Sequence, residues 1–216
     1  MNLPLDRKIS RDFAGAGAGG GLACAVEINE SVKRIVALAA HINKIGVNAI
    51  LLAHRAGDLA RGFGVLSNEL RAYTRQVTTS MKCLSEVSFC IVGEVSALLR
   101  KAHNLRLIEK TQQELRGLGK ESLLDPVLER ASQECLDRAH QLGRLHRALG
   151  SGVEEAQNLG QLGSVLASAA RIEVTYAGAF SAELKDVTVE FGSAIEQIVA
   201  AVEQVKAAAR AQGVRR

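Results

Sequence analysis

The chain has 216 residues and a net charge of +4, with 27 Lys and Arg against 23 Asp and Glu. Hydrophobic residues make up 47% but aromatic residues only 3%, so aliphatic side chains must form any core. The basic residues are neither clustered on one face nor interleaved with aromatic residues, which argues against nucleic-acid binding. No stretch alternates with the period of a β-strand, and the composition favours an all-α protein.

The N-terminal part is rich in glycine. Between Ala14 and Gly21 every residue is alanine or glycine, and glycine is costly to order in a helix. We therefore expect residues 1–22 to form a flexible segment. A GxGxxG-like pattern begins at Gly15, but no predicted strand precedes it, so the pattern does not indicate nucleotide binding.

A first helical hairpin is predicted for residues 23–116. Apolar residues recur at alternating intervals of three and four residues from Ala23 to Arg55 and again from Asp58 to Leu115. This spacing is typical of a coiled coil. Between the two arms, Gly57 can adopt the left-handed conformation that ends a helix. The two arms are therefore expected to pack as antiparallel helices.

A second hairpin is predicted for residues 123–213, with the same apolar spacing on both arms. Either Ser122 or Asp125 can cap its first helix, with Pro126 in the first turn. Glycines interrupt this helix, each costing about 1 kcal/mol relative to alanine, and we expect a kink or local fraying near Gly150–Gly152. The arms of the two hairpins match in length. The sequence thus predicts an elongated antiparallel four-helix coiled-coil bundle made of two helical hairpins, monomeric because the second hairpin replaces a dimer partner.

The stretch around the first turn, residues 43–71, combines small, amide and charged side chains in a distinctive order. Its characteristic positions are Asn43, Asn48, Ala49, Ala53, Arg55, Ala56, Gly57, Asp58, Arg61, Gly62, Phe63, Val65, Glu69 and Arg71. With this set, the stretch resembles the cytoplasmic signalling tip of methyl-accepting chemotaxis proteins, the bacterial chemoreceptors, without a gap. It departs from that family at Leu52, where the family has glutamate, and at Lys44, where an apolar residue is usual.

The second half is similar to the same motif in a weaker form. Residues 166–178 resemble the motif, and the residues that follow resemble its continuation with about one heptad missing, a deletion that keeps a coiled coil in phase. The first turn keeps the family's arginine as Arg55 but has Leu52 for its glutamate. The second keeps the glutamate as Glu173 but has Tyr176 for its arginine. Either these positions have drifted, or each half supplies one charge to an asymmetric tip, which predicts that Arg55 lies near Glu173.

The resemblance implies a protein that signals by binding and is not an enzyme. Its tip would engage a chemotaxis-type histidine kinase and the coupling protein of that kinase, with other receptors as a further class of partner. The candidate interaction residues are Asn43, Asn48, Arg55, Asp58, Arg61, Phe63, Glu69 and Glu173. The alternative is a degenerate structural or regulatory coiled-coil protein, a decoy or receptor-binding protein without kinase control.

No catalytic motif or cofactor site is recognised, and no metal site is expected. The four cysteines (Cys24, Cys83, Cys90 and Cys135) lack metal-ligand spacing, so we expect buried thiols in a reducing compartment. No apolar run approaches the roughly 18 residues that a membrane span requires. These features predict a cytoplasmic protein without a membrane span.

Overall fold

The computed structural model describes residues 17–117 and 124–213, and within these ranges it contains helices and no strands. Four long helices follow one another along the chain. They are α2 (Gly17–Ala56), α3 (Arg61–Arg116), α4 (Asp125–Val174) and α5 (Ser181–Gly213). Short 3-10 helices, η1 (Gly57–Ala60) and η2 (Gly178–Phe180), precede α3 and α5. The predicted all-α fold is confirmed.

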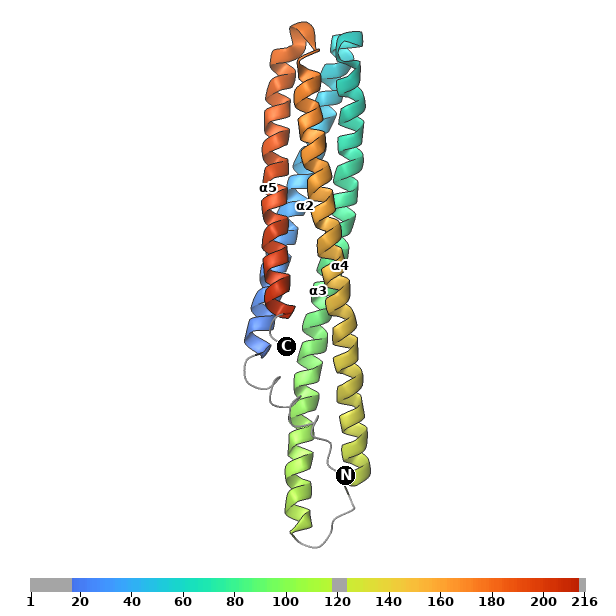
Figure 1. Ribbon diagram of the computed structural model, residues 1–216, viewed down its shortest axis with the longest axis vertical. Helices are drawn as coiled ribbons and strands as arrows, with labels where there is room; N and C mark the ends of the chain where they lie inside the picture. Colours follow the sequence, from blue (N-terminus) through green and yellow to red (C-terminus); the bar gives the residue numbers. More distant parts are fainter. Residues whose placement is uncertain (1–16, 118–123, 214–216) are drawn as a thin grey trace.

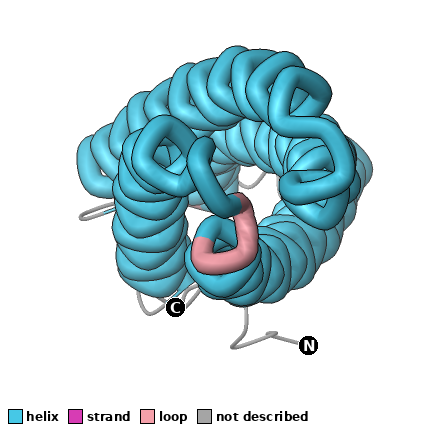
Figure 2. Tube along the Cα trace, turned by 90° about the horizontal axis from the view of Figure 1, so that it is seen from above, coloured by secondary structure: helices cyan, strands magenta, loops and turns pink. Residues whose placement is uncertain are grey.

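The helices form one elongated bundle. The neighbours of α2 are α3 and α5, and α4 packs against the same two helices. Seen along the long axis, the four helices surround a common centre (Figure 2). Both η1 and η2 lie at the same end, which we call the tip, and α3 and α4 extend beyond α2 and α5 at the other end (Figure 1). The antiparallel bundle of two hairpins is therefore confirmed.

The two turns at the tip share one backbone feature. Gly57 has φ = 64° and Gly178 has φ = 57°, and these are the two positive φ angles among the described residues. A side chain in this left-handed conformation costs roughly 1–2 kcal/mol, which glycine avoids. Each glycine then opens a 3-10 turn that leads into the next helix. The role predicted for Gly57 is confirmed, and Gly178 plays the same part in the second hairpin.

The core follows the three-and-four spacing of the sequence. Side chains from all four helices are fully buried along the axis, and their removal from water provides the main driving force for association of the helices. The largest of them are Ile28, Ile35, Ile42, Phe63, Tyr73, Met81, Leu84, Ile91, Leu149, Leu184, Phe191 and Ile195.

Some predicted helix boundaries differ from those observed. The first helix begins at Gly17 instead of Ala23, because adding a residue to an existing helix needs no new nucleus and tolerates glycine. Residues 1–16 of the predicted flexible segment lie outside the described residues. Asp125 is the first residue of α4, not its cap, and its carboxylate accepts a hydrogen bond from the Gln112 side chain of α3. Ser122, the other predicted cap, lies outside the described part.

The local fraying predicted near Gly150–Gly152 is absent from α4, and two glycines of this helix permit close packing. The helix is continuous from Asp125 to Val174. A Cβ atom at Gly152 would lie 2.8 Å from Leu84 Cδ2. A Cβ atom at Gly163 would lie 2.5 Å from the Tyr73 hydroxyl oxygen. Glycine at these two positions therefore makes room for large side chains of α3.

Tyr73 is the largest side chain in that contact. It is 1% exposed, and its hydroxyl group has no hydrogen-bond partner. Burial raises the pKa of Tyr73 to about 12, because the charged phenolate loses its hydration in the core. Tyr73 is thus held by shape and not by a polar contact.

The prediction that all cysteines are buried is wrong for two of them. Cys135 is buried and Cys24 is half-buried, but Cys83 and Cys90 are exposed. The residues that follow them along the chain, Leu84 and Ile91, are buried in the core. Since neighbouring residues on a helix point about 100° apart, the two thiols face away from the core.

The expectation about membrane spans also needs correction. By length and composition alone, the Ala23–Ala56 part of α2 could cross a membrane, with a mean hydropathy of 1.7 over its 18-residue window. In the structure, 33% of that window is buried. The buried face of the helix includes Ile28, Ile35 and Ile42, which pack in the bundle core.

Candidate functional site

The predicted interaction residues fall around the first turn, except Glu173. Asn48 and Arg55 are exposed on α2, and Arg61 and Glu69 are exposed on α3. Arg55 lies in the last turn of α2, and Arg61 is the first residue of α3. Asp58 lies in η1, and its side chain is outside the described part of the structure. Four of the predicted residues therefore present charge or amide groups to solvent near the tip.

Two exposed apolar side chains accompany these cations. Leu51 is 60% exposed and lies one helical turn before Arg55, and Val65 is 62% exposed and lies one turn after Arg61. Residues four apart share a helix face. A Cβ atom at Gly64 would contact the Ala53 side chain, so these parts of α2 and α3 lie at the same level. We call these two exposed pairs, Leu51 with Arg55 on α2 and Arg61 with Val65 on α3, the first-tip patch.

Leu51 and Val65 were not among the predicted site residues. The sequence does contain a sign of their exposure, because both residues are apolar at positions outside the three-and-four spacing that forms the core. Whether such a residue is exposed depends on which faces of its helix have no neighbouring helix. In the bundle the neighbours of α2 are α3 and α5, which leaves an outward face at Leu51.

Phe63 and Asn43 make contacts inside the bundle near the tip. Phe63 is 2% exposed and therefore presents almost no surface to a partner. The half-buried Asn43 of α2 accepts a hydrogen bond from Arg71 Nε of α3 at 3.3 Å.

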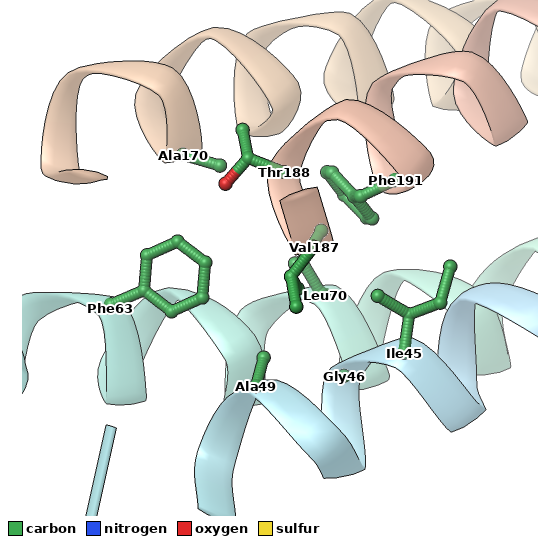
Figure 3. A pocket seen from close by; sticks show the side chains of 9 residues that line it. All are labelled: Ile45, Gly46, Ala49, Phe63, Leu70, Ala170, Val187, Thr188 and Phe191. Atoms are coloured by element: carbon green, nitrogen blue, oxygen red, sulfur yellow. The ribbon is translucent and has the colours of Figure 1, made fainter. Parts of the chain in front are cut away.

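Below the tip, Phe63 borders a small apolar cavity to which all four helices contribute (Figure 3). Its lining residues are Ile45, Gly46, Ala49, Phe63, Leu70, Ala170, Val187, Thr188 and Phe191.

Glu173 of α4 contacts the first hairpin. Its carboxylate occupies the space beside Gly62 where a Cβ atom would lie, with Cδ only 2.5 Å from that position. The first turn of α3 contains no acidic residue, and Ala60 provides no side-chain cap. A carboxylate near a helix N-terminus is favourable, because it opposes the positive end of the helix dipole. Glu173 thus supplies a negative charge to α3 from a neighbouring helix.

The structure does not pair Glu173 with Arg55. Among the ion pairs of the described residues, none joins these two side chains. Arg55 is exposed on α2, whereas Glu173 lies on α4, and the neighbours of α2 are α3 and α5. Arg55 and Glu173 thus form no direct ion pair, and their proximity stays a prediction; the contact that the structure shows for Glu173 is with Gly62 in the N-terminal turn of α3.

The described residues offer no metal centre. Within residues 17–117 and 124–213, no group of three or more His, Cys, Asp or Glu side chains is placed to hold a metal ion. The tip presents exposed apolar side chains and arginines.

Comparison with known proteins assigns no family to the chain. A scan against protein-family models found no match, and searches of curated proteins and of solved structures found none either.

Proposed function

We propose that the chain is a soluble, cytoplasmic signalling protein of the chemoreceptor type, which acts by binding and not by catalysis. Its first-tip patch engages a chemotaxis-type histidine kinase together with the coupling protein of that kinase. The observation that carries the proposal is the patch: exposed Leu51 lies one turn from exposed Arg55 on α2, and exposed Val65 lies one turn from exposed Arg61 on α3. The resemblance of residues 43–71 to the chemoreceptor tip supports the class of partner.

The patch has the composition of a protein-binding site. Interfaces commonly place apolar side chains at the centre and charged groups at the rim, and arginine is enriched in them. Leu51 and Val65 can fill an apolar pocket, while the two guanidinium groups can each donate paired hydrogen bonds to a carboxylate. The fitting partner surface is therefore an apolar groove bordered by Asp or Glu.

One chain supplies both hairpins of the bundle. In the chemoreceptor family two subunits each contribute one hairpin, and here α2–α3 and α4–α5 take those two places. The second tip has the exposed Tyr176 where the first has Arg55. The proposal therefore assigns partner binding to the first tip alone, with one partner for each bundle.

Isothermal titration of the full chain into the kinase and coupling protein of the same cell tests this proposal. Leu51→Glu and Val65→Glu place a negative charge in the patch and should weaken binding at least about tenfold, or 1.4 kcal/mol. Val189→Glu is the matched control, because Val189 is 63% exposed on α5. Equal affinity of all three variants, or no binding by the wild type, would argue against the proposal.

A second candidate function is a decoy that binds other receptors without controlling a kinase. Leu52 favours it, because this residue replaces the family's tip glutamate and packs partly buried against the core. Such a protein would bind receptor tips in a pull-down, and the activity of the kinase would be unchanged by it.

A further inference from the structure

At the end of the bundle opposite the tip, α3 continues beyond the start of α2. Ser85 of α3 donates a hydrogen bond to the Asn29 side chain of α2, which sets the level of the two helices. Gly17, the first residue of α2, comes twelve residues before Asn29 and is therefore level with residue 97 of α3. Since α3 ends at Arg116, roughly 19 of its residues, or about 28 Å, lie beyond α2 (Figure 1).

The fourth helix extends beyond α5 at the same end. Gln157 of α4 donates a hydrogen bond to Glu203 of α5, so Gly213, the last residue of α5, is level with residue 147 of α4. The start of α4 at Asp125 lies well beyond that level. We call α3 from residue 98 onward and α4 up to residue 146 the two-helix extension.

The helix faces that meet α2 and α5 remain apolar where the two-helix extension begins. On α3, steps of three and four residues from Ser85 lead along the α2-facing side to Leu99 and Ala102, which are half-buried. On α4, the same steps back from Gln157 lead along the α5-facing side to Ala139 and Leu136, also half-buried. Within residues 17–117 and 124–213, these four residues lie beyond the ends of α2 and α5. They therefore border the places that α2 and α5 occupy in the rest of the bundle.

The chain that precedes α2 has an amphipathic pattern. Leu5, Ile9 and Phe13 recur at intervals of four residues, so in a helix they share one face, with Arg7 and Arg11 on the other. The expected flexibility of residues 1–22 rested on their glycines, which begin at residue 15, and residues 1–13 contain none. Residues 4–13 therefore have the composition of a short helix with one apolar face.

The position of Gly17 places this segment next to the two-helix extension. The axis of α2, continued backwards from Gly17, runs beside the part of α3 that has no α2 neighbour (Figure 1). At one residue per level, Phe13 falls level with residue 101 of α3, between Leu99 and Ala102. The small Ala102 leaves space there for a large ring.

We propose that residues 4–13 form an amphipathic helix that docks on the two-helix extension and covers Leu99, Ala102, Leu136 and Ala139. Burial of Leu5, Ile9 and Phe13 against an apolar face drives the docking. The segment is joined to α2 at this level, so its effective concentration is in the millimolar range, which favours it over a second copy of the chain. The inference is independent of the first-tip patch, which lies at the other end of the bundle.

Thiol labelling of a cysteine at position 102 tests the docking. In a background with Cys24, Cys83 and Cys90 changed to serine, Ala102→Cys should be labelled at least about tenfold more slowly in the full chain than in a chain without residues 2–13, because labelling requires the segment to open. Leu107→Cys is the control, since Leu107 is 53% exposed, and it should be labelled at the same rate in both chains. Equal rates for Ala102→Cys in the two chains overturn the proposal. Protection that increases with protein concentration also overturns it, because a second copy would then be the cover.

Two full-length variants test which face of the segment docks, without any truncation. Phe13→Ala should raise the labelling rate of Ala102→Cys toward that of the truncated chain, whereas Arg11→Ala, on the opposite face, should leave it slow. Amide hydrogen exchange of residues 4–13 in the wild type should be at least about tenfold slower than in an unstructured peptide of the same sequence. Exchange as fast as in that peptide, or equal labelling rates for the two variants, overturns the proposal. Melting curves of each variant confirm that it is folded.

Discussion

Gly163→Ala should destabilise the bundle although alanine favours helices. Alanine in place of glycine within a helix contributes about 1 kcal/mol. At this position, however, the new Cβ atom would lie 2.5 Å from the Tyr73 hydroxyl oxygen, 2.9 Å from Cζ and 3.3 Å from Ile195 Cγ2. Tyr73 is 1% exposed, so its ring has no open space to enter. Overpacking of this kind costs about 1–3 kcal/mol, and two contacts under 3 Å place Gly163→Ala at the upper end.

The expected net loss is therefore about 2 kcal/mol in the free energy of unfolding. Gly150→Ala is the matched control on the same helix, because nothing lies within 4 Å of its new Cβ atom. It should gain about 1 kcal/mol. Urea unfolding followed by circular dichroism measures both, and a shift of roughly 2–4 °C per kcal/mol is expected in melting temperature.

Tyr73→Phe distinguishes overpacking against Tyr73 from a general intolerance of α4 to substitution. The substitution removes the hydroxyl oxygen closest to the new Cβ atom, and in the wild type it removes a buried hydroxyl group without a partner. Alone it should be neutral or slightly stabilising. Combined with Gly163→Ala it should recover at least about 0.5 kcal/mol relative to additivity. If Gly163→Ala is as stable as Gly150→Ala, the packing argument for the glycines of α4 is refuted.

Three further predictions concern charge and exposure. Because the pKa of Tyr73 is about 12 in the fold against 10.0 ordinarily, its stabilising contribution is complete below pH 10 and is lost as pH rises through 12. The wild type should lose up to about 3 kcal/mol more than Tyr73→Phe across that window. Glu173→Gln should lower the free energy of unfolding by about 0.3–1 kcal/mol at low salt and by less at high salt, and an unchanged melting temperature at low salt would contradict the dipole argument. A thiol reagent should label Cys83 and Cys90 in the folded protein and Cys135 only on unfolding, and slow labelling of all three thiols would show that α3 is oriented differently.

The bundle was predictable because one periodicity serves both secondary and tertiary structure. Three-and-four spacing defines a helix and also the face that it buries, so Ile28, Ile35 and Ile42 are identified as core before any neighbour is known. Gly57 was predictable for a similar reason, since ending a helix in the left-handed conformation is a local property.

The remaining features depend on which helices are neighbours. Glu173 faces α3 because α4 lies beside α3, and the sequence alone allowed it to be placed beside Arg55. The glycines of α4 have a visible cost in helix propensity, but their benefit requires Tyr73 and Leu84 on another helix. The apolar residues of the first-tip patch were missed for the same reason, because the outward face of α2 at Leu51 is identified only from the neighbours of that helix.

The rate of kinase autophosphorylation shows whether the first-tip patch engages a histidine kinase complex. The rate is measured with the coupling protein present, while the full chain is titrated from zero to saturation. The proposal predicts a concentration-dependent change in rate that Leu51→Glu and Val65→Glu abolish and Val189→Glu preserves. A rate that the wild-type chain leaves unchanged at saturating concentration would contradict the proposal.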